Sequence, residues 1–369
     1  MGSPDPEKSN PEVNVGDFLM SLMRSKLMDK VEVVVLYNNL DKTVRSEPNL
    51  IAEYLVKAGK ITRFQAERIL KGKSRGLVMK DYQVLSVLGR GGMSTVYLAR
   101  KNGKNDDKLN FVSMKVLRTL KTERQDRLIS RFKREFYIAQ KLDHPNVVKV
   151  FSLEDFAGLN YMLIEFIQGK SLQKIIDESG AISQDLAIKL MRNTLTALAH
   201  CHQQGVIHRD VKPSNIMVTP ENQAKLFDFG LAFVVGEKEE DLKIIGGKGY
   251  IVGTMDYIAP EQSYNSIDID GRADLYGLGC TFYHALTGKL PYPGLEKKDK
   301  IKAQRSKEKS EPITNFRTDL SDWFVELVER MMNKSKDNRP DSAMTVLLEL
   351  DLMTPPPLPD WVDFEDDED

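Results

Sequence analysis

The sequence contains little cysteine and no long apolar run. Its 369 residues include two cysteines, Cys201 and Cys280, each among apolar residues at helical spacing. Both thiols are expected to be buried and reduced, which argues against a disulfide-stapled secreted protein and favours the cytoplasm. No apolar stretch approaches the roughly 18 residues that a membrane-crossing helix needs, so no membrane span is expected.

The net charge is also small, with 53 basic and 54 acidic side chains giving −1. Acidic residues make up seven of the last ten, so the rest of the chain carries about +6. This excess is too small to indicate nucleic-acid binding, and no nucleic-acid partner is expected. With 41% hydrophobic residues, the chain can bury a substantial core.

A dense group of polar side chains lies between His208 and Gly230. His-Arg-Asp-Val-Lys-Pro-Ser-Asn ends at Asn215, and Asp-Phe-Gly begins at Asp228 after two short apolar runs joined by a turn. The runs predict a β-hairpin that brings Asp210, Asn215 and Asp228 to one site. Asp210 can accept a proton from a hydroxyl, and the other two supply the oxygen ligands that Mg²⁺ prefers. A polar loop without function is the alternative, but two spaced signatures within 23 residues argue against it.

These residues resemble the catalytic segment of the eukaryotic-like Ser/Thr protein kinases found in bacteria. The resemblance extends from about Tyr82 to Met353 and implies an α+β, bilobal kinase fold. The β-rich N-lobe would cover residues 82–164, the hinge 165–169 and the helical C-lobe 170–353. The implied reaction transfers the γ-phosphoryl group of ATP to Ser or Thr of protein substrates, autophosphorylation included, with Mg²⁺ or alternatively Mn²⁺ as the metal.

The resemblance also assigns roles to single residues. Asp210 would orient and deprotonate the acceptor hydroxyl, and Lys212 would reach the γ-phosphate. Asn215 and Asp228 would hold the metal ions. Thr254 would hydrogen-bond Asp210 and Lys212, and the place of Lys212 two residues after Asp210 favours Ser or Thr over Tyr as acceptor.

The expected nucleotide site lies mostly upstream of this segment. Lys115 would hold the α- and β-phosphates and pair with Glu135 on the following helix. Ser94 departs from the family pattern, because a third glycine usually stands there. The residues expected to contact ATP are Leu88, Gly89, Arg90, Gly91, Gly92, Met93, Ser94, Thr95, Val96, Ser113, Lys115, Ile164, Glu165, Ile167, Ser171, Met217 and Asp228.

A pseudokinase that only binds partners is the alternative function. Its usual mark is the loss of Lys115, Asp210, Asn215 or Asp228, and all four are present. Structural roles are expected for three further groups. His208 would pack inside the C-lobe, Asp274 would anchor the catalytic loop, and Glu261 would pair with Arg339.

The segment after Gly230 contains no Ser or Thr from Leu231 to Gly253, and Tyr250 is its only hydroxyl. In related kinases the residue at Arg209 binds a phosphate on this loop and orders it. We therefore expect activity without loop phosphorylation. A permanent carboxylate partner for Arg209 is expected from among Glu237, Glu239, Glu240 and Asp241.

Residues 1–16 are polar, contain proline and are expected to be disordered. Residues 17–75 contain a repeat with an offset of 33 residues. Both copies contain a predicted capping box, Asp29 with Glu32 and Thr62 with Gln65, so each predicts a helical hairpin. Together the two hairpins predict a small four-helix module.

This module resembles extensions that precede some bacterial kinase domains, and three functions fit it. The basic residues of the second copy suggest a DNA-binding helix-turn-helix, but Glu67 interrupts the basic face. The other two are a docking or homodimerisation module and a structural brace for the kinase domain. An acidic tail at residues 354–369 ends the sequence.

Overall fold

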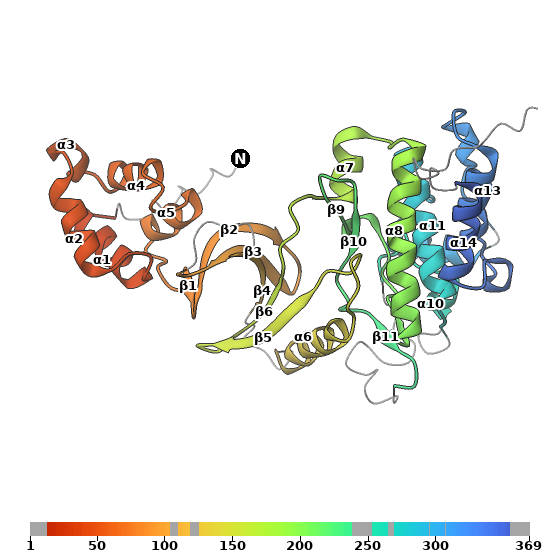
Figure 1. Cartoon of the computed structure of the whole chain (residues 1–369), viewed down its shortest axis with the longest axis horizontal. Coiled ribbons are helices and arrows are strands. Elements are labelled where there is room, and N and C mark those ends of the chain that lie inside the picture. The colour runs from red at the N-terminus through yellow and green to blue at the C-terminus, as the bar shows by residue number, and fades with distance from the viewer. Residues whose placement is uncertain are drawn as a thin grey trace, which may run out of the picture. The chain divides into compact units, whose positions relative to one another are not determined.

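The computed structural model describes residues 13–103, 110–118, 125–237, 253–264, 269–294, 296–306 and 308–354. The chain divides into two compact units (Figure 1). The first unit contains residues 1–125 and 151–166, and the second contains residues 126–150 and 167–369. No helix in the described ranges combines the length and apolar character needed to cross a membrane.

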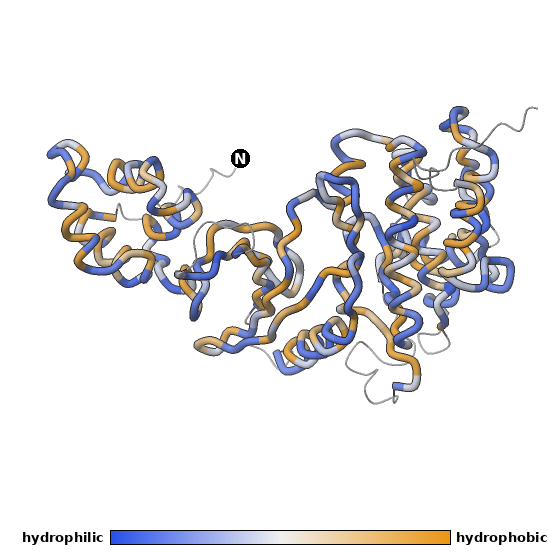
Figure 2. Tube along the Cα trace, viewed as in Figure 1, coloured by the Kyte–Doolittle hydropathy of each residue, from blue (hydrophilic) through white to orange (hydrophobic). Residues whose placement is uncertain are grey.

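The first unit begins with a helical segment whose repeat is visible in three dimensions. Its helices are α1 (Val15–Ser25), α2 (Lys30–Asn39), the short α3 (Lys42–Arg45), α4 (Pro48–Lys57) and α5 (Arg63–Leu70). Helices α4 and α5 begin 33 residues after α1 and α2. Equivalent positions of the two copies are buried. They are Phe18 and Leu22 in the first copy, and Ile51 and Leu55 in the second. Apolar residues recur along these helices (orange in Figure 2), so the predicted hairpins are confirmed.

The two predicted capping boxes differ. Thr62 accepts a hydrogen bond from the Gln65 backbone N–H, and the Gln65 side chain accepts one from the Thr62 N–H, which confirms the box at α5. At α2, Asp29 accepts from the Glu32 N–H, but the Glu32 carboxylate pairs with Lys60 at 3.0 Å. The prediction of a reciprocal box was therefore wrong at Asp29, because a tertiary cation competes for the Glu32 side chain.

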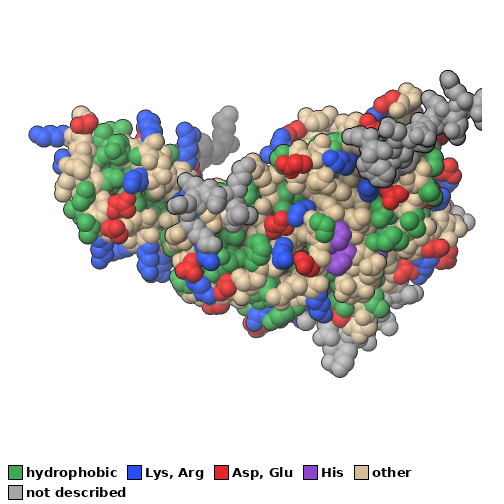
Figure 3. All heavy atoms as spheres, viewed as in Figure 1, with side chains coloured by type: hydrophobic (Ala, Val, Ile, Leu, Met, Phe, Trp, Pro, Cys, Tyr) green, Lys and Arg blue, Asp and Glu red, His purple; other side chains and the backbone are tan. Residues whose placement is uncertain are grey.

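Apolar side chains also lie on the surface of this helical segment (green in Figure 3). Val31, Val34 and Val35 of α2 are exposed, and Val31 retains 72% of its accessible surface. This exposure agrees with the docking or dimerisation interpretation without testing it. That interpretation stays a prediction.

A six-stranded sheet follows, in the order β1-β2-β3-β4-β6-β5. Its strands are β1 (Val78–Met79), β2 (Tyr82–Arg90), β3 (Ser94–Lys101), β4 (Phe111–Leu117), β5 (Val150–Phe156) and β6 (Leu159–Glu165). Antiparallel pairing joins β1 through β4 and then β6. Fully buried Ala99, Met114 and Tyr161 centre the core under the sheet.

The second unit is mainly helical. Its main helices are α6 (Gln125–Gln140), α7 (Leu172–Ser179), α8 (Gln184–Gln203), α10 (Pro260–Tyr264), α11 (Arg272–Thr287), α12 (Lys297–Arg305), α13 (Asp322–Met331) and α14 (Ala343–Met353). Its strands are β7 (Lys170–Ser171), β8 (Val206–Ile207), β9 (Ile216–Val218), β10 (Ala224–Leu226) and β11 (Phe233–Val234). Helix α8 lies beside α11 and α14 (Figure 1), and their facing apolar side chains form the core. The predicted α+β fold, with a β-rich unit and a helical one, is confirmed.

Cys201 on α8 and Cys280 on α11 are both buried free thiols. Burial raises the pKa of each thiol, to about 12 for Cys280. The prediction that both cysteines are buried thiols not joined in a disulfide is confirmed.

Candidate active site

The catalytic loop after β8 is held by one buried carboxylate. Asp274 on α11 accepts hydrogen bonds from the backbone N–H groups of His208 and Arg209, at 2.9 and 2.7 Å, and contacts His202 Nε2 at 2.8 Å. Burial alone would raise the pKa of this carboxyl, but the contacts with His202 and His208 outweigh burial and lower it. Asp274 therefore stays ionised and fixes the loop backbone, including Arg209 at its positive φ of 64°.

His208 packs as predicted. Its side chain is fully buried, its ring meets the ring of Phe229 edge-on at 4.9 Å, and Nε2 lies 3.1 Å from the Phe227 carbonyl oxygen. The backbone N–H of Asp210 contacts His208 Nδ1 at 3.3 Å. Both ring nitrogens thus have intramolecular contacts, which suits a structural residue and not a proton shuttle.

Asp210 lies at the centre of a hydrogen-bonded group formed by residues from two segments, the catalytic loop and the turn at Thr254. Its Oδ1 accepts from the backbone N–H and the hydroxyl of Thr254, each at 3.0 Å. Its Oδ2 accepts from Lys212 Nζ at 2.6 Å and from Asn215 Nδ2 at 3.1 Å. Lys212 Nζ also donates to Thr254 Oγ1 at 2.6 Å. The structure therefore brings together four of the residues that the sequence predicted.

The orientation of Asn215 fits a metal ligand. Its amide nitrogen donates to the backbone oxygen of Asp210 at 2.9 Å as well as to Oδ2 of that residue. With the nitrogen used in this way, the amide oxygen is the atom that remains to bind a cation. The 3₁₀ turn Pro213–Asn215 and strand β9 fix the residue behind the hairpin β9–β10.

Two more predicted carboxylates converge at Gly230. A Cβ built on Gly230 would lie 3.4 Å from Asp228 Oδ1 and 3.4 Å from Glu135 Oε2. Glu135 comes from α6, whereas Asp228 follows β10 and has a positive φ of 69°. The carboxylates of Asp228 and Glu135 therefore lie close together beside Gly230. Neither side chain lacks a partner.

The glycine-rich loop, residues 88–96, belongs to the first unit. Ser94, in place of the usual third glycine, begins β3, is 8% exposed and lies opposite Leu117. The N–H of Gly91 donates to the Ser94 carbonyl oxygen at 2.9 Å and closes the hairpin. Ser94 is thus buried, and the hairpin forms with serine at this position. Its contact with ATP stays a prediction, as do those of Leu88 to Met93, Thr95 and Val96.

Lys115 lies on β4, opposite Val96 on β3 and Met162 on β6. Ser113 lies on the same strand opposite Ile164. Because Lys115 and Glu135 belong to different units, their ion pair stays a prediction.

The predicted adenine-site residues are also divided between the units. Ile164 and Glu165 end β6 in the first, whereas Ile167, Ser171 and Met217 belong to the second. Ser171 and Met217 are paired neighbours on β7 and β9.

The sequence did not reveal the steric role of Gly169 in this segment. A Cβ there would lie 2.1 Å from the Val218 carbonyl oxygen, so only glycine permits this close approach of two backbones. An isolated glycine after a buried strand is the signal that was available.

An ion pair between Arg134 on α6 and Glu237 was also missed. Arg134 Nε donates to Glu237 Oε1 at 3.1 Å, Nη2 donates to Oε2, and Nη1 donates to the Ala232 carbonyl oxygen at 2.7 Å. Glu237 also accepts from the Val234 N–H at 3.2 Å. The side chains are 10% and 18% exposed. This bidentate pair joins the segment after Gly230 to α6, the helix that carries Glu135.

Arg209 lies close to the same pair. Burial, together with the neighbouring charge of Arg134, lowers its pKa to about 10, although Asp274 and Glu237 oppose the shift. Its Nε donates to the Leu231 carbonyl oxygen at 2.9 Å. The predicted carboxylate thus lies within electrostatic range of Arg209 but bonds directly to Arg134. Glu239, Glu240, Asp241 and Tyr250 lie outside the described residues.

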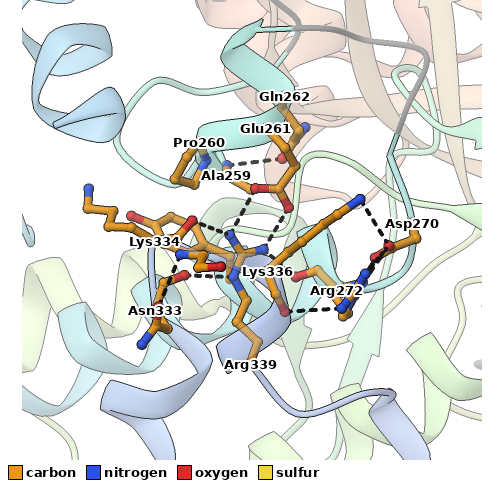
Figure 4. Close-up of polar contacts among 12 residues, drawn as sticks. Ala259, Pro260, Glu261, Gln262, Asp270, Arg272, Asn333, Lys334, Lys336 and Arg339 are labelled. Carbon is orange, nitrogen blue, oxygen red and sulfur yellow. Dashed lines mark hydrogen bonds and ion pairs between the residues drawn. The ribbon is translucent and has the colours of Figure 1, made fainter. Parts of the chain in front are cut away.

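The predicted pair of Glu261 and Arg339 is confirmed (Figure 4). Arg339 Nη1 and Nη2 donate to the two carboxylate oxygens at 2.6 and 2.8 Å. The Arg339 guanidinium also donates to the carbonyl oxygens of Asn333 and Arg272, at 2.7 and 2.9 Å. Its side chain is fully buried, so this group holds the segment after Thr254 against the helical core.

The catalytic loop, its anchor and this ion pair all lie within one stretch of the chain that matches a known family. The family description "Protein kinase domain" matches residues 82–349, nearly three quarters of the chain. The chain belongs to the protein kinase family. The helical segment before Tyr82 lies outside the matched range.

Relatives of this kinase domain come from bacteria. A probable serine/threonine-protein kinase of Clostridium perfringens is 34% identical over 270 residues, and the serine/threonine-protein kinase PknB of Mycolicibacterium smegmatis is 33% identical over 273 residues. The serine/threonine-protein kinase pkn3 of Myxococcus xanthus is 33% identical over 279 residues. Each match covers 73% of this chain, and 38%, 42% and 49% of the respective relative. The matched region is therefore less than half of each relative.

Proposed function

We propose that this kinase domain transfers the γ-phosphoryl group of ATP to Ser and Thr hydroxyls of protein substrates. The observation that carries the proposal is the intact group around Asp210. Lys212, Asn215 and Thr254 all contact its carboxylate at 2.6 to 3.1 Å. Asp210 is 7% exposed, so its charge acts where water screens little.

Asp210 would receive the proton of the acceptor hydroxyl. The hydroxyl oxygen then bonds to the γ-phosphorus as the bond to the β–γ bridging oxygen breaks, and ADP leaves. A carboxylate offers about four acceptor positions, and the Asp210 carboxylate has four hydrogen bonds. An acceptor hydroxyl that bonds to Asp210 therefore displaces one of these donors. Lys212, which would reach the γ-phosphate, is the donor expected to leave Oδ2.

The donor set fits a hard cation such as Mg²⁺, with Asn215 Oδ1 and the Asp228 carboxylate as protein ligands. The metal would neutralise charge on the phosphates. Asn215 is held in place for this role by its two hydrogen bonds to Asp210. Two protein oxygens leave the remaining coordination positions to water and phosphate.

Transfer of radiolabel from Mg-ATP to a generic basic protein, or to the chain itself, tests the proposal. Label should appear in the acceptor and vanish when the metal is chelated. ATP binding without transfer by the wild-type chain would favour the pseudokinase instead. No observation in the described residues favours that alternative.

We also expect that the kinase keeps its activity after phosphatase treatment, because Glu237 already gives Arg134 a permanent anionic partner. Glu237→Gln should lower kcat about ten-fold, since hydrogen bonds to charged groups contribute about 1.5–3 kcal/mol and the loop would be less firmly ordered. Steady-state rates before and after phosphatase treatment measure this.

The matched control is Glu178→Gln, which removes an exposed carboxylate of the same unit. A charge-reversed pair, Arg134→Glu with Glu237→Arg, should recover part of the rate lost in either single variant. Collapse of wild-type activity on phosphatase treatment, with Tyr250 found phosphorylated beforehand, would show that a phosphate orders the loop.

A further inference from the structure

The capping box of α5 makes hydrogen bonds beyond its own helix. Its two side chains satisfy each other's backbone N–H groups, which is the usual local role. The remaining donors point at strand β2. Thr62 Oγ1 donates to the Leu85 carbonyl oxygen at 2.6 Å, and Gln65 Nε2 donates to the Val84 carbonyl oxygen at 2.8 Å. Gln65 is 2% exposed, so its bonds are made away from water.

Strand β2 has a defect at this point. Its pairing with β3 shifts register between Val84 and Ser86, so Leu85 has no partner residue on β3. On its other side, β1 pairs only with Tyr82 and Gln83. In a regular strand consecutive carbonyls point to opposite edges, and a bulge at Leu85 explains why two consecutive carbonyls face α5. The Val84 N–H donates to the Leu77 carbonyl oxygen at 2.9 Å, and the side chains of α5 supply donors to the Val84 and Leu85 carbonyls.

Apolar contacts reinforce this junction. Phe64, between the two capping residues, packs against both the helical core and the core of the sheet. Its ring lies 6.0 Å from the ring of Tyr97 on β3. Leu77, just before β1, is 1% exposed and belongs to the helical core. The helical segment and the sheet therefore form one packed structure within the first unit.

The contacted strand is the one that leads into the glycine-rich loop. After the bulge, β2 continues to Gly89 and Arg90, with a second register shift between Val87 and Gly89. A short length of strand thus lies between a point fixed by α5 and the loop. A change in the position of α5 on β2 moves the base of that loop.

We propose that Thr62 and Gln65 are positioning residues through which the helical segment sets the glycine-rich loop for ATP, an inference that rests on the proposed kinase function. Of the three interpretations of this segment, the contacts favour the brace. As a brace, the helical segment contacts β2, the strand that leads into the glycine-rich loop.

Gln65→Glu in the full chain is the sharpest test. Glutamate keeps the size and the acceptor oxygen for the Thr62 N–H, so the capping box survives. It replaces the donor to Val84 with a carboxylate oxygen facing a carbonyl oxygen. The KM for ATP and the calorimetric Kd for Mg-ADP should each rise about three- to ten-fold, while kcat changes less than two-fold.

Position Glu32 provides the matched control, because it is the repeat equivalent of Gln65 and pairs with Lys60 instead of β2. Glu32→Gln should leave nucleotide affinity unchanged. Thr62→Asp keeps the cap but removes the donor to Leu85, and should weaken affinity in the same direction. Thr62→Ser keeps a hydroxyl donor to the Leu85 carbonyl and should therefore keep the wild-type nucleotide affinity.

Circular dichroism and amide hydrogen exchange show whether the effect is positional. Helix content should be unchanged in Gln65→Glu and Thr62→Asp, while exchange in β2 becomes faster. Unchanged Mg-ADP affinity in both variants would overturn the inference, as would a loss of kcat and thermal stability alone. A wild-type chain that binds Mg-ADP but transfers no phosphate would refute the kinase function, and the affinities would still decide the role of Gln65.

Discussion

Replacing Asp210 by Asn should slow phosphoryl transfer by about 10²–10⁴-fold, the usual contribution of a general base. The amide keeps the size of the side chain, and its single oxygen can still accept hydrogen bonds from Thr254. Its NH2 group cannot accept the hydrogen bond from Lys212, and the amide cannot take the proton of the acceptor hydroxyl. Nucleotide affinity should change little, because Asp210 is not among the residues expected to contact ATP. Single-turnover transfer and calorimetric binding of Mg-ADP separate the two effects.

Asp143→Asn is a suitable control for this substitution. The Asp143 side chain is 86% exposed and pairs with Lys149, so the variant should transfer phosphate at the wild-type rate. A transfer rate in Asp210→Asn equal to that of the control would refute the role assigned to Asp210.

Arg339→Met should lower the free energy of unfolding of the helical unit by about 3–5 kcal/mol, because it leaves the Glu261 carboxylate without its cation. Arg339 is fully buried, whereas Glu261 is 16% exposed. Arg339 also lies 4.9 Å from the ring centre of Tyr276, and that contact would be weakened too. Chemical denaturation followed by tryptophan fluorescence or circular dichroism measures the change.

Lys170→Met is the matched comparison, because it breaks an exposed pair with Glu178 in the same unit. Its effect should stay within about 1 kcal/mol. An equal loss of the free energy of unfolding in Arg339→Met and Lys170→Met would show that the buried pair stabilises the unit no more than the exposed pair does.

The sequence predicted the catalytic segment well because its chemistry is local. Asp210, Lys212 and Asn215 lie within six residues, and their spacing already places them around one carboxylate. The hairpin after Asn215, the anchor Asp274 and the pair of Glu261 with Arg339 were likewise predicted from motifs and were found in the structure. The repeat predicted helices whose starts and buried positions recur at the same offset.

The missed contacts depend on tertiary structure. Arg134 and Glu237 are 103 residues apart, and no local pattern identifies which loop carboxylate reaches α6. The sequence predicted the capping box at Thr62. It did not predict that the Thr62 hydroxyl and the Gln65 amide donate to β2, because these bonds depend on the bulge at Leu85. In the first repeat the same pattern was misread at Glu32, because Lys60, in the turn between α4 and α5, pairs with the Glu32 carboxylate. The sequence pattern thus predicts the hydrogen bonds within a capping box, whereas tertiary packing determines the partners of the other side-chain atoms.

The most direct test identifies the amino acid that receives the phosphate. The wild-type chain is incubated with Mg-ATP labelled in the γ-phosphoryl group and a protein acceptor, and the acceptor is hydrolysed and its phosphoamino acids are separated. Label on serine or threonine is the expected result, as the arrangement of Asp210, Lys212 and Thr254 favours aliphatic hydroxyls. Label on tyrosine alone, or none on the acceptor or the chain while nucleotide binds, would contradict the proposed function.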